Sequence, residues 1–302
     1  MVTLIQEHCS QNNRRFVVQL HDGAQVEAVV YRGDTLCISS QVGCAVSCPF
    51  CASGARGFAR NLELAELLGQ VDAVRDLGVP LRRVTVSGVG EPLHNRALLP
   101  FIEACRAQRL GPSVTTSGGP LPRLPELLES IHNGVTLSIH AGTEATRARA
   151  VPKGPALGPL FDLLRETVPG LSGRRKRRLA LAYLMVRGLN DSEADLLSFR
   201  SLAEPLDVTV HLYDYNPVPT SEHQPVGRQA YEQAYTLLSA TGLRVRMSSR
   251  ARLDENGGCG TLVAQQPWLG SKNGQGVTPG SQGEGAVAGR SAHRTLPVLE
   301  SR

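Results

Sequence analysis

The sequence has few aromatic residues and no long apolar run. Phe, Trp and Tyr make up 4% of its 302 residues, so stacking of bases on aromatic side chains is not an obvious means of binding nucleic acid. No stretch approaches the roughly 20 apolar residues that a membrane span needs, and the polar N-terminal residues do not resemble a signal peptide. From these absences we expect a cytoplasmic protein with no membrane partner.

Neither sign of charge dominates. The formal net charge is +5, and the residues from Gln265 onward hold four cations and two carboxylates, which leaves +3 for the rest of the chain. A surplus this small permits a nucleic-acid partner without requiring one. The five consecutive basic residues Arg174 to Arg178 could contact phosphates or form an ordinary solvated loop.

Strand-like and helix-like patterns alternate along the chain. Residues 15–40 alternate apolar and polar side chains around the turn His21-Asp22-Gly23, which predicts a small N-terminal sheet of two or three strands. Apolar runs then alternate with helical patterns, which predicts βαβ units and a parallel sheet with its active site at the carboxyl ends of the strands. The strand-like runs are 83–88, 113–118, 135–140, 179–186 and 208–213; the helical patterns are 62–77, 97–109, 157–167, 192–203 and 227–241.

These patterns predict an α/β fold: a partial, TIM-like (β/α) barrel with a small N-terminal β-sheet extension. We expect residues 1–40 to form strands packed on the barrel and residues 41–262 to form the core barrel. Residues 263–302 are rich in glycine and lack hydrophobic periodicity. We therefore expect them to be a disordered tail.

Cysteine is the most informative residue type in the chain. Seven cysteines without an export signal are more typical of metal binding or catalysis than of disulfides. Cys44, Cys48 and Cys51 have C-x3-C-x2-C spacing directly after a predicted strand. A structural zinc site is closed by four ligands, whereas a four-iron cluster held by three cysteines leaves one iron free. The spacing favours such a cluster over a zinc ion completed by a distant histidine.

An open iron can hold the amino and carboxylate groups of S-adenosylmethionine and deliver an electron to its sulfonium. The segment Ser87-Gly88-Val89-Gly90-Glu91-Pro92 follows the next predicted strand. Its glycines would let the backbone approach a ligand, and its carboxylate could accept from an ammonium group. Taken alone, the segment is better explained as an ordinary turn at the end of a strand, because short glycine motifs are weak signals.

Four segments, LCISSQVGCAVSCPFCASGARGFARNL, SGVGEPL, LSIHA and YNPVP, resemble in order the RlmN/Cfr family of radical S-adenosylmethionine RNA methyltransferases. The resemblance covers about residues 25–262. It implies one 4Fe-4S cluster on Cys44, Cys48 and Cys51, with S-adenosylmethionine as the other cofactor. It also implies an adenine of rRNA or tRNA as methyl acceptor, with carbon 2 favoured over carbon 8. We find no counterpart of the family's small N-terminal accessory domain and expect a shortened form.

The resemblance assigns further residues, and two of the cysteines outside the cluster loop gain a role from it. Cys259 matches the cysteine that becomes S-methylcysteine, Cys37 the one that then forms a transient disulfide with it, and Glu27 a proton acceptor. This scheme implies an electron donor for the cluster and a thiol reductant for the disulfide. Cys9 and Cys105 match nothing, and we expect them to be small buried hydrophobes. The cofactor-binding positions of the family fall on Gly90, Glu91, Thr115, Ser138, Ile139, His140 and Asn216.

Two other classes of protein remain open at this point. A radical enzyme that methylates a peptide or a small molecule would share the cluster and cofactor sites. A non-catalytic metal-binding or redox protein would use the three cysteines only to hold metal. The combination of Cys37, Cys259 and Glu27 favours methylation of an aromatic carbon, because an electron-poor ring carbon does not attack a methyl group in an ordinary displacement.

Overall fold

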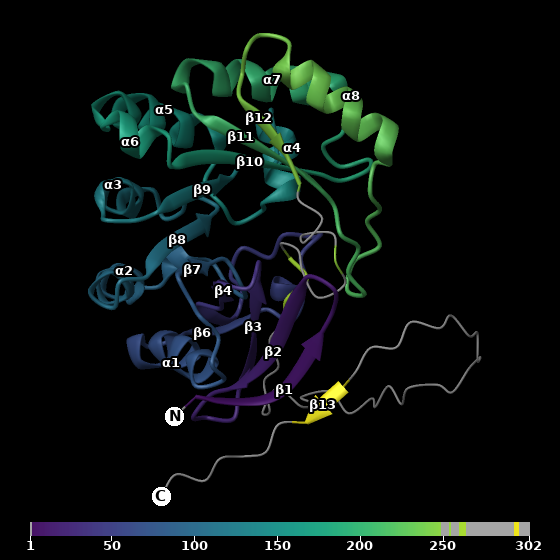
Figure 1. Ribbon diagram of the computed structural model, residues 1–302. Helices are drawn as coiled ribbons and strands as arrows, with labels where there is room; N and C mark the ends of the chain where they lie inside the picture. Colours follow the sequence, from purple (N-terminus) through teal and green to yellow (C-terminus); the bar gives the residue numbers. More distant parts are fainter. Residues whose placement is uncertain (1, 249–253, 255–259, 264–292, 296–302) are drawn as a thin grey trace, which may run out of the picture.

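The computed structural model describes residues 2–248, 254, 260–263 and 293–295. One curved sheet of eleven strands runs through this part of the chain in the order β12-β11-β10-β9-β8-β7-β4-β3-β2-β1-β13, and β5 pairs with β6 in a separate hairpin. From β4 to β12 the neighbouring strands are parallel, and from β4 to β13 they are antiparallel. The longer helices lie along the outer face of the curve (Figure 1).

The strands are β1 (Thr3–Cys9), β2 (Asn13–Gln19), β3 (Gln25–Tyr31), β4 (Thr35–Ile38), β5 (Gln41–Gly43), β6 (Phe58–Asn61), β7 (Arg83–Val86), β8 (Gly111–Thr116), β9 (Gly134–Ser138), β10 (Leu179–Met185), β11 (Thr209–Asp214), β12 (Val245–Met247) and β13 (His293–Thr295). The α-helices are α1 (Leu64–Arg75), α2 (Leu98–Ala107), α3 (Leu124–Glu129), α4 (Glu144–Ala150), α5 (Leu157–Thr167), α6 (Gly173–Lys176), α7 (Glu193–Ala203) and α8 (Arg228–Ser239). Short 3-10 turns begin at Ala52, Pro92, Leu121, Val168 and Glu204.

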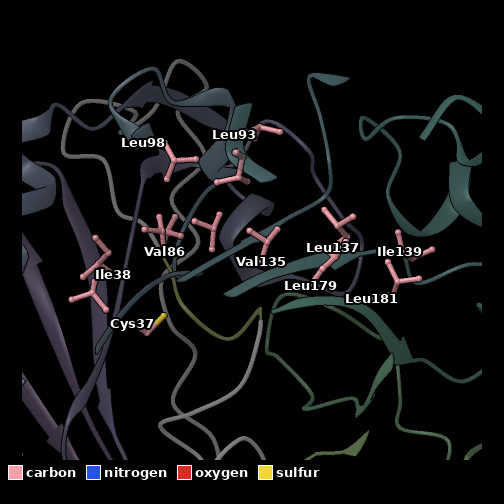
Figure 2. Close-up of a cluster of buried hydrophobic side chains, with 14 of the residues drawn as sticks. Cys37, Ile38, Val86, Leu93, Leu98, Val135, Leu137, Ile139, Leu179 and Leu181 are labelled. Atoms are coloured by element: carbon pink, nitrogen blue, oxygen red, sulfur yellow. The ribbon is translucent and has the colours of Figure 1, made fainter. Parts of the chain in front are cut away.

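The two faces of the parallel part of the sheet differ in chemistry. The side chains that face the helices are aliphatic and fully buried, as for Val86, Leu137 and Leu181 (Figure 2). The residues that alternate with them, such as Thr85 and Thr136, line a cavity on the concave face. Because successive side chains of a strand point to opposite faces, this alternation gives the sheet a packed outer side and a polar inner side.

The fold class predicted from the sequence is confirmed. The helices α1, α2, α5, α7 and α8 lie within the predicted helical segments, and β7 to β11 lie on the predicted strand-like runs. The sheet is open, since β12 and β13 are its two edges in the described part of the chain. The periodicity did not predict β1, β12 or the helices α3, α4 and α6, which have seven residues or fewer and show too few turns for a clear pattern.

The two cysteines that match nothing in the family differ in burial. Cys105 is fully buried in the core on α2, as expected. Cys9 is exposed, and the expectation was wrong for it: it lies at the end of β1, where its thiol donates to Glu7 Oε1 at 3.3 Å. In the residues that the structure describes, no helix combines the length and the apolar character that crossing a membrane would require.

Candidate active site at the carboxyl ends of the strands

The loop after β5 holds three cysteines on one wall of a cavity. Cys44, Cys48 and Cys51 are each half-buried and line this cavity together with residues from the ends of β7, β8, β9 and β10. The β5–β6 hairpin closes the loop, since the backbone N–H of Cys44 donates to Gly57 O at 3.0 Å. At Gly43, φ is +80° and a Cβ atom would lie 2.0 Å from that same carbonyl oxygen, so only glycine fits at this crossing.

The cysteines fit a cluster rather than a single ion. In the described residues, no group of three or more Cys, His, Asp and Glu side chains is arranged around one metal ion. A 4Fe-4S cluster does not need that arrangement, because each cysteine binds a different iron atom. Burial raises the pKa of the Cys44 thiol to about 12, and burial and the neighbouring Cys51 and Cys44 raise the pKa of Cys48 well above its ordinary value. Iron must therefore displace protons when it binds.

Glu91 lies at the end of β7 on the opposite wall. It is 4% exposed. Its Oε1 accepts from the backbone N–H of Leu93 at 3.0 Å and from the Thr116 hydroxyl, and its Oε2 accepts from the backbone N–H of Ser117 at 2.7 Å. Each carboxylate oxygen has two lone pairs, so Glu91 joins the ends of β7 and β8 and can still accept from a ligand. The neighbouring Gly90 has φ +112°, and a Cβ there would lie 2.6 Å from Gln41 Cβ.

The three predicted residues at the end of β9, Ser138, Ile139 and His140, lie in two different environments. Ser138 and His140 line the cavity, as does the predicted Thr115 of β8. Ile139 is fully buried and packs in the aliphatic core with Leu137 and Leu181 (Figure 2). Its side chain is therefore not part of the cavity. Its backbone N–H donates to Ala182 O at 3.0 Å, and its carbonyl oxygen accepts from Arg147 at 2.7 Å.

His140 is held as a neutral ring. Its Nδ1 accepts a hydrogen bond from the backbone N–H of Leu184 at 3.0 Å, so the ring proton resides on Nε2. Burial and the nearby Arg147 lower the pKa of His140 to about 3. The ring meets Phe50 edge to face, with 5.7 Å between centroids. His140 can thus serve the cavity as a fixed donor that carries no charge.

Arg147 was not predicted from the sequence. It lies on α4, is 1% exposed, and donates to four backbone carbonyl oxygens: Ser117 at 2.9 Å, Ser138 and Ile139 at 2.7 Å, and Pro155 at 3.0 Å. Burial lowers its pKa to about 10, while Cys48 and Glu91 oppose that shift. Arg147 therefore places a cation behind the cysteine wall and ties together the ends of β8 and β9. Its distance in sequence from the cysteines gives no signal of this role.

Asn216 lies outside the cavity lined by the cysteines. It follows β11, and its Nδ2 donates to the backbone oxygen of Asp254 at 3.4 Å. Among the predicted cofactor positions, the structure thus gathers Gly90, Glu91, Thr115, Ser138 and His140 around the cysteine loop, and leaves Asn216 and the side chain of Ile139 apart.

The other two predicted catalytic residues in the described part of the chain lie on β3 and β4. Cys37 is 9% exposed, and its Sγ is 3.2 Å from the hydroxyl oxygen of Ser87. Glu27 has a side chain that is 12% exposed, with Oε1 3.9 Å from Arg15 Nε and Oε2 accepting from the backbone N–H of Val263 at 2.8 Å. Burial raises the pKa of Glu27, and Arg15 opposes this.

A short C-terminal segment, Gly260 to Val263, docks on the cysteine loop. Gly260 O accepts from the backbone N–H of Ala52 at 2.7 Å, and Leu262 O accepts from the Ser53 hydroxyl at 2.7 Å. A Cβ on Gly260 would lie 3.4 Å from Cys51 Sγ. The predicted methyl-carrying Cys259 lies outside the described residues, but the residue that follows it is in contact with the cysteine loop.

Comparison with known proteins agrees with this geometry. A model of the radical SAM superfamily matches residues 38–199. A probable dual-specificity RNA methyltransferase RlmN of Chlorobium luteolum is 32% identical over 269 residues, which are 83% of this chain and 74% of that protein. A probable RNA methyltransferase of Rhodopseudomonas palustris is 34% identical over 261 residues, covering 83% of this chain and 71% of that protein.

Two solved structures are also similar. The crystal structure of a radical SAM methyltransferase from Sphaerobacter thermophilus superposes with a TM-score of 0.75 at 28% identity and covers 86% of this chain and 81% of that one. Streptococcus suis SuiB bound to precursor peptide SuiA gives a TM-score of 0.57 at 13% identity, covering 72% of this chain and 48% of that one. At that identity, the second similarity concerns the fold alone.

The partial barrel and the three cysteines in the loop after β5 place the protein in the class of radical SAM enzymes. The cofactors of this enzyme are accordingly a 4Fe-4S cluster and S-adenosylmethionine. Within that class, the chain belongs to the RlmN/Cfr family.

Proposed function

We propose that this enzyme transfers a methyl group to a ring carbon of adenine in RNA, carbon 2 in preference to carbon 8. RNA as the acceptor is supported by the relatives, which are named as RNA methyltransferases. The observation that carries the proposal is the docking of Gly260 to Val263 on the cysteine loop, because it tethers the residue directly after Cys259 at the cluster site. A protein that used its three cysteines only to hold metal would not need this contact.

The residues that line the cavity indicate how the cluster and S-adenosylmethionine would be held. Cys44, Cys48 and Cys51 would hold the cluster, which supplies the electron that opens S-adenosylmethionine to a carbon radical. Glu91 would accept from the amino group of S-adenosylmethionine, with Gly90 leaving room for its backbone to approach. Thr115, Ser138 and His140 would add polar contacts from the neighbouring strand ends, whereas Ile139 would act through its backbone. Asn216, which follows β11 and lies outside this cavity, would be a further contact of the cofactor.

Methyl transfer and product release would use two different cysteines, both outside the cluster loop. Cys259 as a thiolate would take a methyl group by displacement, since sulfur is a good nucleophile. Once the methyl carbon is bonded to adenine, Glu27 would remove a proton from the adduct. Cys37 as a thiolate would attack the Cys259 sulfur, forming a Cys37–Cys259 disulfide and breaking the bond from that sulfur to carbon. The released carbon would take up a proton and become the methyl group of the product, and an external thiol would then reduce the disulfide. An electron donor is needed for the cluster as well.

The structure around Cys37 and Glu27 is compatible with these roles. Cys37 lies beside Ser87, which lines the same cavity as Glu91. Glu27 is largely buried, and its carboxylate accepts a hydrogen bond from Val263 within the docked segment. A base with its pKa raised by burial is closer to neutral pH and therefore a better proton acceptor.

The test is anaerobic methyl transfer. The cluster-loaded protein is given a reductant, methyl-labelled S-adenosylmethionine and unmodified rRNA or tRNA, and the digested nucleosides are analysed by mass spectrometry. We expect label in 2-methyladenosine. Label in 8-methyladenosine would reject the choice of carbon, and cleavage of the cofactor with unlabelled RNA would reject RNA in favour of a peptide or small-molecule acceptor.

The Cys37→Ala variant separates transfer from release. We expect it to form a covalent adduct with RNA and to fail to release it, which a denaturing gel shows as a slow-migrating protein–RNA band. Cys105→Ala, at a buried cysteine on α2, is the matched control and should give free product. A Cys37→Ala protein that gives no such band would contradict the disulfide step.

A further inference from the structure

The concave face of the sheet forms a second cavity at the end opposite to the cysteine loop. It has a volume of about 300 Å³, which is at the small end of the range for ligand sites. Its walls are residues of β4 and of β7 to β12, with the loops before some of these strands. Thr85, Ser113, Thr115, Thr136, Thr209 and His211 give it polar groups, and Val84, Val114, Leu179 and Ala180 give it apolar ones. The interior of a closed (β/α)8 barrel is filled mainly by branched aliphatic side chains. This interior is polar instead.

Five arginines surround the mouth of this cavity, and no carboxylate in the described part of the chain lines it. Arg32, Arg83, Arg177 and Arg246 are exposed and Arg178 is half-buried. None of the five forms an ion pair with a residue that the structure describes. Burial and the nearby cations Arg174 and Arg106 lower the pKa of Arg178. The mouth thus concentrates unneutralised positive charge.

The cavity with the arginine mouth adjoins the candidate active site on the inner face of the sheet. Thr115 of β8 and Tyr213 of β11 line both cavities. The Tyr213 hydroxyl is also 3.1 Å from Nδ1 of His211, which lines the cavity with the arginine mouth. The two cavities therefore adjoin on the concave side of the sheet and share two side chains that carry a hydroxyl group.

We propose that the mouth formed by Arg32, Arg83, Arg177, Arg178 and Arg246 binds a backbone phosphate of a single RNA strand whose adenine reaches the cysteine loop. This inference rests on the proposed function. Arginine is suited to the task because its planar fork matches two phosphate oxygens. A cavity of about 300 Å³ has room for about one nucleotide unit and is too small for a double helix. The basic run Arg174 to Arg178 contributes its last two residues.

The experiment measures binding without turnover. The cluster-loaded protein, with no reductant present, is titrated into a short fluorescent single-stranded RNA, and anisotropy is recorded over a range of salt concentrations. For Arg83→Gln combined with Arg246→Gln, we expect the Kd to rise about tenfold or more. The slope of log affinity against log salt should fall by about 0.7 for each phosphate that the variant no longer neutralises. The absorbance of the cluster checks that the variant is folded and loaded.

A matched control carries the same number of substitutions on the helices. Arg165 is paired with Asp162 on α5, and Arg228 with Glu232 on α8; Arg165→Gln combined with Arg228→Gln should leave both Kd and salt slope unchanged. Equal weakening in both double variants, or no weakening in the mouth variant, would overturn the inference. Inorganic phosphate is titrated separately. If phosphate binds at the mouth but the mouth variant keeps full affinity for RNA, the inference is also overturned, because the site would then bind a free anion.

The outcome is independent of methyl transfer. Mouth-dependent RNA binding without any methyladenosine product would reject the proposed reaction and leave this inference standing. Methyladenosine formed by a mouth variant with unchanged KM for RNA would reject this inference and leave the proposed reaction standing.

Discussion

At the scale of single residues, neighbours in sequence have separate tasks. Ser138 and His140 line the cavity, whereas Ile139 between them packs in the core. Arg147, seven positions after His140, reaches back and donates to the carbonyl oxygens of Ser138 and Ile139. Its guanidinium donates to backbone carbonyl oxygens at the ends of the strands that the hydrogen bonds of helices and sheet leave without a partner. Those acceptors would be buried without a partner if the side chain were removed.

Arg147→Met should destabilise the protein strongly. The substitution orphans carbonyl groups at the ends of β8 and β9, and each buried unsatisfied group costs about 1–3 kcal/mol. We expect a decrease of about 3 kcal/mol or more in the free energy of unfolding, measured in urea. Arg147→Lys, which keeps the charge and some donors, should be destabilised less.

The control is Arg149→Met on the same helix, where the side chain is exposed and donates to Gly188 O at 3.0 Å. It should change the free energy of unfolding by less than about 0.5 kcal/mol. Similar decreases for Arg147→Met and Arg149→Met would mean that the buried carbonyl contacts contribute little.

At the scale of elements, the cysteine loop is supported by the helix that follows it. Arg60 on β6 donates to Glu66 of α1 at 2.7 and 2.8 Å and to Asp22 at 2.9 Å. Glu66 also forms a reciprocal capping box with Glu63 at the start of α1. The β5–β6 hairpin is therefore joined to the first turn of α1, and the capping box of Glu63 and Glu66 sets where that helix begins.

This junction predicts a pH-dependent stability. Burial alone would raise the pKa of Glu66, but the hydrogen bonds from Arg60 and from the Glu63 backbone outweigh it, and the pKa is lowered. A lowered pKa stabilises the folded state at any pH above the ordinary value of about 4.3. That contribution disappears as the pH falls through the lower, folded-state pKa.

Glu66→Gln should therefore be less stable than the parent protein by about 1–3 kcal/mol at neutral pH, and the difference should shrink in acid. Urea unfolding across the acidic range checks this. Glu103→Gln, at an exposed position of α2, should show no such pH-dependent difference. If the difference in free energy of unfolding between Glu66→Gln and the parent protein stayed constant down to the lowest pH measured, the ionised carboxylate would not be its cause.

At the scale of the whole molecule, the candidate site is assembled from both ends of the chain. Gly260 to Val263 returns to contact Glu27 near the N-terminus and the loop around Cys51. Leu262 is 4% exposed and joins the main hydrophobic core. The burial of this side chain adds to the hydrogen bonds that the backbone of the segment forms with Ala52, Ser53 and Glu27.

Leu262→Ala should release the segment while leaving the barrel folded. Burying a leucine contributes about 2–4 kcal/mol, enough to shift a short docked segment to its open state. We expect iron content and far-ultraviolet circular dichroism to be kept, and methyl transfer from labelled S-adenosylmethionine to fall about tenfold or more. Leu77→Ala, at a side chain that is 39% exposed, should keep full activity. Full activity of Leu262→Ala would show that the docking is not needed.

Much of the fold could be predicted from local patterns in the sequence. The longer helices and the strands β7 to β11 follow from hydrophobic period, since each element shows enough turns or alternations to identify itself. The cysteine spacing and the segment around Glu91 identified the rim on which the site lies, because the ends of parallel strands meet at one edge of the sheet. The short helix α4 and with it Arg147 had no such signature.

By itself, the sequence determined the class of fold, the cysteine loop and the order of the elements, all of which depend on residues close together in the chain. Only the tertiary structure decided which side of each strand faces the cavity, that Arg147 supports the cysteine wall, and that Gly260 to Val263 docks beside Glu27. It also decided that five arginines from four distant segments of the chain meet at one mouth. These are contacts between distant segments, fixed by the curvature of the sheet and the burial of its outer face, and no local pattern encodes them.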